Sequence, residues 1–85
     1  MATVTWTMRA TKQYAKLPKH DQAAVSKGVD GLVLWPDCHN VKALIGRSDY
    51  RLRVGRYRVI FTVDTNNVPV VVRIEEVKKR DEHTY

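Results

Sequence analysis

The sequence predicts an α+β fold in which a short N-terminal strand and a helical hairpin precede an antiparallel sheet of about three further strands. Three observations predict it: a β-forming segment at the start, apolar residues at helical spacing on both sides of Pro18, and alternating apolar and polar residues beyond residue 49. Helices followed by consecutive strands pack on one face of the sheet, so we expect the other face to be open.

The N-terminal segment predicts a strand and a helix. Residues 3–8, TVTWTM, alternate and are rich in β-forming residue types, so they predict a strand. Residues 9–17 carry apolar side chains at helical spacing and predict a helix. Pro18 ends this helix and can occupy an early position of the next one.

Residues 19–35 predict the second helix, weakened by Gly28 and Gly31. Its apolar side is formed by Ala24 or Val25 together with Val29, Leu32 and Val33. After it, residues 37–48 predict a connecting loop, with a turn of helix or a short strand near residues 41–45.

The stretch DYRLRVGRYRVIF, residues 49–61, predicts a β-hairpin. Its Gly55-Arg56 pair suits a type II′ turn, in which glycine is preferred at the first central position. The resulting register opposes Val54 to Tyr57, Arg53 to Arg58 and Leu52 to Val59. All the apolar side chains except Ile60 then share one face, and the other face carries Arg51, Arg53 and Arg58. Because directly opposed like charges destabilise a sheet, we expect an anion or a carboxylate to bind there.

A further strand is predicted over residues 68–77, VPVVVRIEEV, after a turn at residues 64–67. Successive strand residues point to opposite faces, so Glu75 and Glu76 are not expected to act as paired carboxylates. One of them is expected to neutralise an arginine. The remaining segment, KKRDEHTY, is strongly charged.

Composition favours a cytoplasmic protein with one domain, residues 1–85, and a polyanionic partner. The chain has 85 residues, a net charge of +6 and a pI near 9.8, which favours binding to nucleic acid or anionic lipid. One cysteine allows no internal disulfide, as is usual in a reducing compartment. No apolar run resembles a signal peptide or a membrane span, so we expect no membrane association.

Metal, cofactor and thiol chemistry find little support in the sequence. Cys38 and His39 are adjacent, but no second pair stands at a metal-ligand spacing, and no third group is available to orient a Cys–His nucleophile. We therefore expect Cys38 to be a small apolar filler and the side chain of His20 to be solvated. No glycine-rich phosphate loop opens a helix, so we expect no cofactor.

The remaining candidates are cations and a tyrosine of the hairpin and the C-terminal segment: Arg51, Arg53, Arg56, Arg58, Lys78, Lys79, Arg80, His83 and Tyr85. Cations can hold RNA phosphates, and tyrosine can stack on bases. The 2′-hydroxyl of RNA can attack its own 3′-phosphate if cations stabilise the transition state, without metal, and leaves a 2′,3′-cyclic phosphate. The alternative is that these residues are ordinary surface cations on a sheet face that is exposed to water.

YRLRVGRYRVIF and IEEVKKRDEHTY, residues 50–61 and 74–85, resemble RelE-type toxins of the RelE/ParE superfamily, from type II toxin–antitoxin systems. KQYAKLPKHDQ and WPDCHNVKALIG fit the helical hairpin and the connector of that family. The resemblance implies a fold like that of microbial ribonucleases and an endoribonuclease that cuts mRNA in the ribosomal A site. It also implies a cognate antitoxin in a hetero-oligomeric complex.

Position by position, the resemblance implies a catalytic set consisting of Arg58, Arg80, Tyr85 and, for proton transfer, His83. It also implies that Arg51 and Arg53 bind RNA. Their positive charge adds Arg56, Lys78 and Lys79 to the predicted RNA-binding set. The family often has lysine where Arg51 and Arg53 stand. Arginine is far harder to deprotonate, so these two are expected to position RNA.

Two other functions fit the same sequence. The first is a ParE-like toxin that inhibits DNA gyrase on the same fold, without needing the arginine–tyrosine set. The second is a non-enzymatic module that binds nucleic acid and shows strong salt dependence without cleavage.

Overall fold

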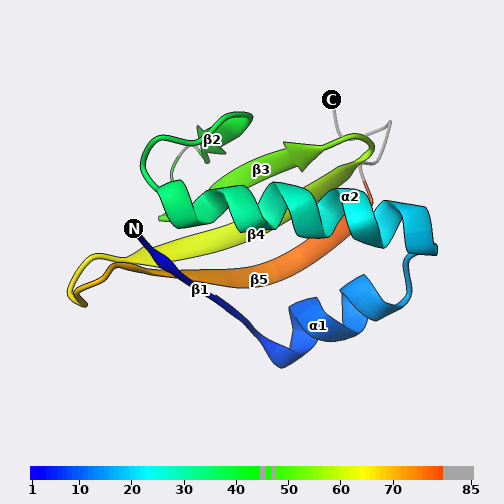
Figure 1. The fold of residues 1–85 in the computed structure, drawn as a ribbon, viewed down its shortest axis with the longest axis horizontal. Helices are drawn as coiled ribbons and strands as arrows, with labels where there is room; N and C mark the ends of the chain where they lie inside the picture. The colour runs from blue at the N-terminus through cyan, green and yellow to red at the C-terminus, as the bar shows by residue number, and fades with distance from the viewer. Residues whose placement is uncertain (45, 47, 80–85) are drawn as a thin grey trace.

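A computed structural model describes residues 1–44, 46 and 48–79, and these form a five-stranded sheet with two α-helices (Figure 1). In chain order the elements are β1 Thr3–Trp6, α1 Met8–Ala15, α2 Lys19–Asp30, the 3₁₀ helix η1 Gly31–Leu34, β2 Val41–Ala43, β3 Tyr50–Val54, β4 Tyr57–Asp64 and β5 Val71–Lys79. None of the described helices is long and apolar enough to cross a membrane.

The predicted α+β class is confirmed, with one strand more than expected after the helices. The strand order is β1-β5-β4-β3-β2, in which β1 pairs with β5 in parallel and the other pairs are antiparallel. The additional strand is β2, where a short strand or a helical turn was expected. It pairs with the outer edge of β3, Lys42 opposite Arg51.

The helices begin near the predicted positions but end earlier. Thr7 caps α1, since its Oγ1 accepts a hydrogen bond of 3.1 Å from the Ala10 amide. The α-helical part of the second predicted helix ends at Asp30 and continues as η1. A β-carbon on Gly28 would lie 2.8 Å from Cγ2 of Val54. Glycine at this position therefore lets α2 approach β3 closely.

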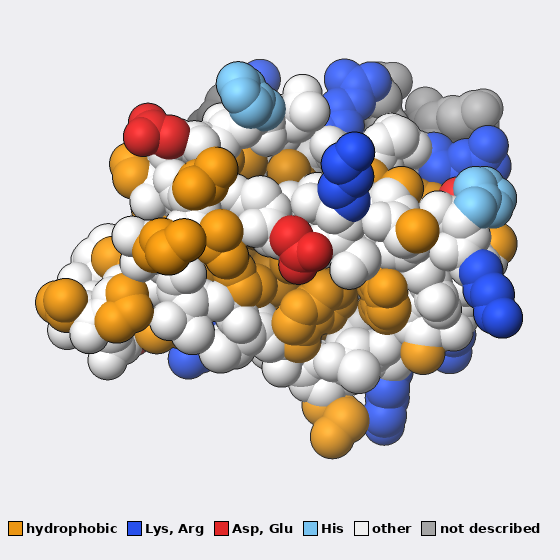
Figure 2. Space-filling model, viewed as in Figure 1, with side chains coloured by type: hydrophobic (Ala, Val, Ile, Leu, Met, Phe, Trp, Pro, Cys, Tyr) orange, Lys and Arg blue, Asp and Glu red, His pale blue; other side chains and the backbone are white. Residues whose placement is uncertain are grey.

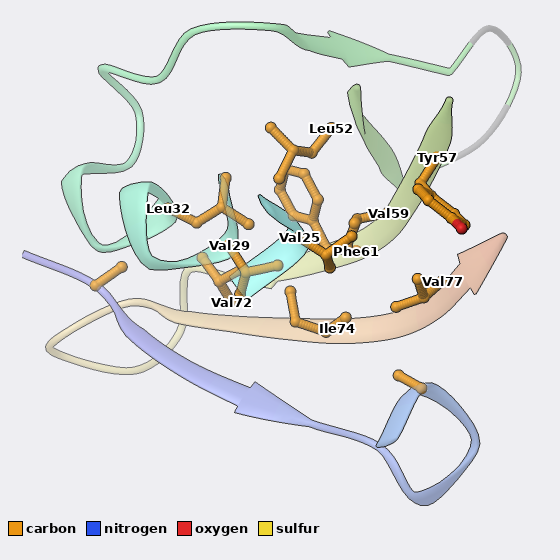
Figure 3. Packing of buried hydrophobic residues seen from close by; sticks show 12 residues of the cluster. Val25, Val29, Leu32, Leu52, Tyr57, Val59, Phe61, Val72, Ile74 and Val77 are labelled. Atoms are coloured by element: carbon orange, nitrogen blue, oxygen red, sulfur yellow. The ribbon is translucent and has the colours of Figure 1, made fainter. Parts of the chain in front are cut away.

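The core lies between α2 and one face of the sheet (Figure 3). The largest fully buried side chains are Phe61, Leu32, Ile74, Val25, Val29, Val59 and Val72. Of the two residues that the sequence left open, Val25 is buried and Ala24 is exposed. Trp35 packs edge-on against Phe61, with a centroid separation of 5.7 Å. Burial of these apolar side chains is the main favourable term that holds α2 against the sheet.

Helix α1 covers the edge of β5 where β1 has ended. The register of β1 reaches Ile74, and beyond it Oε1 of Gln13 accepts a hydrogen bond of 2.7 Å from the amide of Val77. A strand edge left open would expose unpaired backbone groups, which favour association with other chains. The side chain of Gln13 thus continues the role of β1 along β5.

Candidate functional site

The sheet face opposite α2 carries a row of three cations, and we call this surface the arginine face. The predicted hairpin register is confirmed: Arg53 is opposite Arg58 on β4, and Arg58 is in turn opposite Lys78 on β5. Gly55 has φ of 54° at the turn, as a type II′ turn requires. Adjacent strands lie about 4.8 Å apart, so the three positive side chains start very close together.

A second row lies beside the first and is mixed in character. It runs across four strands and consists of Lys42, Arg51, Ile60 and Glu76. Ile60 is the apolar residue that the sequence placed on the arginine face, and it is only 6% exposed there. Lys42 was not singled out from the sequence. A three-residue strand gives too little alternation to show that its side chain shares a face with Arg51.

Arg58 is the central member of the cationic row and is partly buried. Its Nη2 atom is almost inaccessible to solvent. Charge–charge interactions strengthen as water is excluded, so a guanidinium in this position acts on a bound phosphate more strongly than a fully solvated one. The sequence predicted the face on which Arg58 lies, but not its burial.

Glu75 and Glu76 both lie on the arginine face, which corrects the expectation that they point to opposite faces. The pairing of β4 with β5 shifts between Ile60 and Phe61: Ile60 is opposite Glu76, but Phe61 is opposite Ile74. Glu75 is the extra residue of a β-bulge, and both glutamates line the same hollow. Simple alternation therefore fails at this point of the strand.

The two carboxylates have different partners. Oε1 of Glu76 lies 3.4 Å from Nζ of Lys78 and 3.6 Å from Nη1 of Arg9. Oε2 of Glu75 accepts a hydrogen bond of 3.0 Å from Oγ1 of Thr62. Glu76 thus neutralises an arginine, Arg9, as expected of one of the glutamates, and it also neutralises part of the positive charge at the Lys78 end of the cationic row.

Two predicted RNA-binding residues lie apart from this row. Lys79 is opposite Tyr57, whose side chain belongs to the buried core, so Lys79 starts on the helical side of the sheet. Arg56 is exposed in the turn between β3 and β4. The predicted residues Arg80, His83 and Tyr85 lie outside the described residues. Figure 2, viewed from the helical side, shows Lys and Arg mainly toward the end that carries this turn.

Tyr57 connects the sheet to the start of α2. Its hydroxyl donates a hydrogen bond of 2.7 Å to Oδ2 of Asp21, and Nε2 of His20 lies 2.9 Å from the other carboxylate oxygen. This hydrogen bond is the main reason that the pKa of Tyr57 is raised, followed by burial and the charge of Asp21, while Arg56 opposes the change. His20 is largely exposed, as expected, but it contacts a carboxylate.

Cys38 does not have the features of a nucleophile. Burial, and to a lesser extent the charge of Asp37, raise the pKa of its thiol, which disfavours the reactive thiolate. Its side chain packs against the core, as expected of an apolar filler. Among the residues that the structure describes, no group of three or more His, Cys, Asp or Glu side chains is arranged to hold a metal ion.

Several solved structures have a fold similar to that of this chain. A chain of the toxin–antitoxin complex RelBE2 from Mycobacterium tuberculosis is 30% identical, with 92% of this chain and 96% of that chain covered and a TM-score of 0.78. A chain of the RelE–RelB complex from Pyrococcus horikoshii is 28% identical, with 95% of this chain and 97% of that chain covered and a TM-score of 0.78. The isolated RelE toxin of E. coli, at 21% identity, 94% and 85% coverage and a TM-score of 0.77, shares the fold. No protein-family model and no curated protein matches the sequence.

Proposed function

Since this chain belongs to the RelE-type toxins of the RelE/ParE superfamily, we propose that it is a ribosome-dependent endoribonuclease that cuts mRNA in the A site and inhibits translation. The observation that supports this activity is the row of Arg53, Arg58 and Lys78 across three adjacent strands. Adjacent cations on neighbouring strands form a positively charged surface that attracts the phosphates of RNA. The site of action is then cytoplasmic.

In the proposed mechanism the 2′-hydroxyl loses its proton and attacks the adjacent phosphate, the P–O5′ bond breaks and the 5′-oxygen gains a proton, so no metal is required. Arg58 and Arg80 stabilise the negative charge of the pentacoordinate transition state, while Arg51 and Arg53 hold the backbone in line. Tyr85 orients or activates the 2′-hydroxyl, and His83 acts as the acid or the base in one of the two proton transfers. The products are a 2′,3′-cyclic phosphate and a 5′-hydroxyl.

We also propose that a cognate antitoxin binds this chain in a hetero-oligomer. The relatives at 30% and 28% identity are chains of complexes between a RelE toxin and a RelB antitoxin. The cationic row favours an antitoxin segment with acidic residues, because opposite charges on two partners favour their association.

The test adds the purified protein to ribosomes programmed with a defined mRNA and maps the cuts. We expect cleavage within the A-site codon, and none of naked mRNA under the same conditions. A gyrase supercoiling assay runs in parallel. Inhibition of gyrase together with intact mRNA would overturn the proposal in favour of a ParE-like toxin. Salt-sensitive RNA binding without either effect would favour a non-enzymatic module.

A further inference from the structure

A hollow of about 440 Å³ lies on the arginine face beside the cationic row. Its strand residues Ile60 and Glu76 are paired on the face of the sheet opposite the core residues Phe61 and Ile74. Its lining combines one apolar side chain with hydroxyl, carboxylate and guanidinium groups: Thr7, Arg9, Asp49, Ile60, Thr62, Glu75 and Glu76. The volume is within the range of roughly 300–1,000 Å³ that is usual for small-ligand sites.

The apolar and guanidinium groups of the hollow suit a flat aromatic ligand. Ile60 is the apolar member of the lining and lies two residues along β4 from Arg58, a separation of about 7 Å. Arg9 stands at the rim with its side chain 70% exposed, and its guanidinium is held 3.6 Å from Glu76. Guanidinium planes stack on unpaired RNA bases. A base placed here would therefore lie beside a phosphate held by Arg58.

The lining of the hollow is rich in hydrogen-bond acceptors. Ionised carboxylates only accept hydrogen bonds, so the hollow disfavours phosphate and favours a ligand edge that carries N–H donors. The β-bulge directs Glu75 onto this face, and Thr62 fixes one of its oxygens at 3.0 Å. Glu75 is thus an oriented hydrogen-bond acceptor beside the cationic row.

We propose that this hollow binds guanine next to the scissile phosphate, with Glu75 accepting hydrogen bonds from N1–H and the N2 amino group. This inference rests on the proposed ribonuclease function. Guanine alone among the four RNA bases presents two adjacent donors, which match the two oxygens of a carboxylate. Adenine and cytosine place an acceptor nitrogen beside their amino group, and the N–H of uracil lies between two carbonyls, so a carboxylate is repelled in each case.

The test measures binding of four 2′-O-methyl trinucleotides that differ only in the central base, which the protein cannot cleave. We expect the guanine trinucleotide to bind at least about tenfold more tightly than the other three, as a lost bidentate contact predicts. Glu75→Gln should abolish this preference and Thr62→Val should weaken it. Asp30→Asn, which removes a carboxylate on the helical side, should retain it.

Equal affinity for all four bases would overturn the inference, as would a guanine preference that persists in folded Glu75→Gln. The two proposals fail separately. Ribosomal cleavage without base preference in binding would overturn the guanine site alone. Guanine preference without any cleavage by the wild-type protein on ribosomes would support the site and overturn the ribonuclease activity.

Discussion

At the scale of single residues, the proposed cleavage depends most on Arg58, which lies between Arg53 and Lys78. Arg58→Met keeps the apolar stem of the side chain and removes the charge at the centre of the cationic row. We expect cleavage on ribosomes to fall by about 100- to 1,000-fold, as when one preorganised donor to a developing oxyanion is lost. The matched control is Lys12→Met, which removes an exposed cation from α1 and should leave the rate unchanged. Equal cleavage rates for Arg58→Met and Lys12→Met would show that Arg58 does not take part in catalysis.

Tyr57 gives a pH-dependent prediction. Its pKa is raised in the folded protein, mainly by the hydrogen bond to Asp21, so its neutral form stabilises the fold. That contribution is complete below the unfolded-state pKa of about 10 and is lost as pH rises through the folded-state pKa. We expect the unfolding free energy of the wild type to fall more steeply above pH 10 than that of Tyr57→Phe. Urea titrations at several pH values measure this, and parallel pH profiles would contradict it.

At the scale of elements, the packing of α2 on β3 depends on Gly28. Alanine is favoured over glycine in a helix by about 1 kcal/mol, but its β-carbon here would lie 2.8 Å from Val54, and overpacking costs about 1–3 kcal/mol. We expect Gly28→Ala to be destabilising in urea unfolding. Gly31→Ala, which meets nothing within 4 Å, should instead stabilise by about 0.4–1 kcal/mol. An equal increase in the free energy of unfolding for both variants would contradict this, because it would show that β3 shifts to accommodate the added β-carbon at position 28.

The elements also show what the sequence could predict. The β3–β4 register was predictable because Gly55-Arg56 fixes the turn and alternation is unbroken on both sides of it. The bulge at Glu75 was not, since polar residues at 75 and 76 fit either face until the partner strand is known. The position of Lys42 on the arginine face was not predictable for a related reason, because β2 has only three residues and takes its register from β3. In both cases the pairing with a neighbouring strand, and not the local sequence pattern, determines the face on which the side chain lies.

At the scale of the whole molecule, the apolar core and the candidate site lie on opposite faces of one sheet. The helices bury the apolar side chains on one face, as Figure 3 shows for Phe61 and its neighbours. The other face is therefore able to carry opposed cations and a hollow with two glutamates. The alternation of the strands predicted this division. The family resemblance predicted which cations matter, and for Arg80, His83 and Tyr85 it stays a prediction.

The 2′-hydroxyl mechanism is tested best on programmed ribosomes with an mRNA that carries one 2′-deoxynucleotide immediately 5′ of the mapped cut. Attack by the RNA's own 2′-hydroxyl predicts that this bond stays intact. It also predicts that the unmodified message is cut there and carries a 2′,3′-cyclic phosphate. Cleavage of the deoxy-substituted message at the same bond would contradict the account, because a nucleophile other than the 2′-hydroxyl would then be at work.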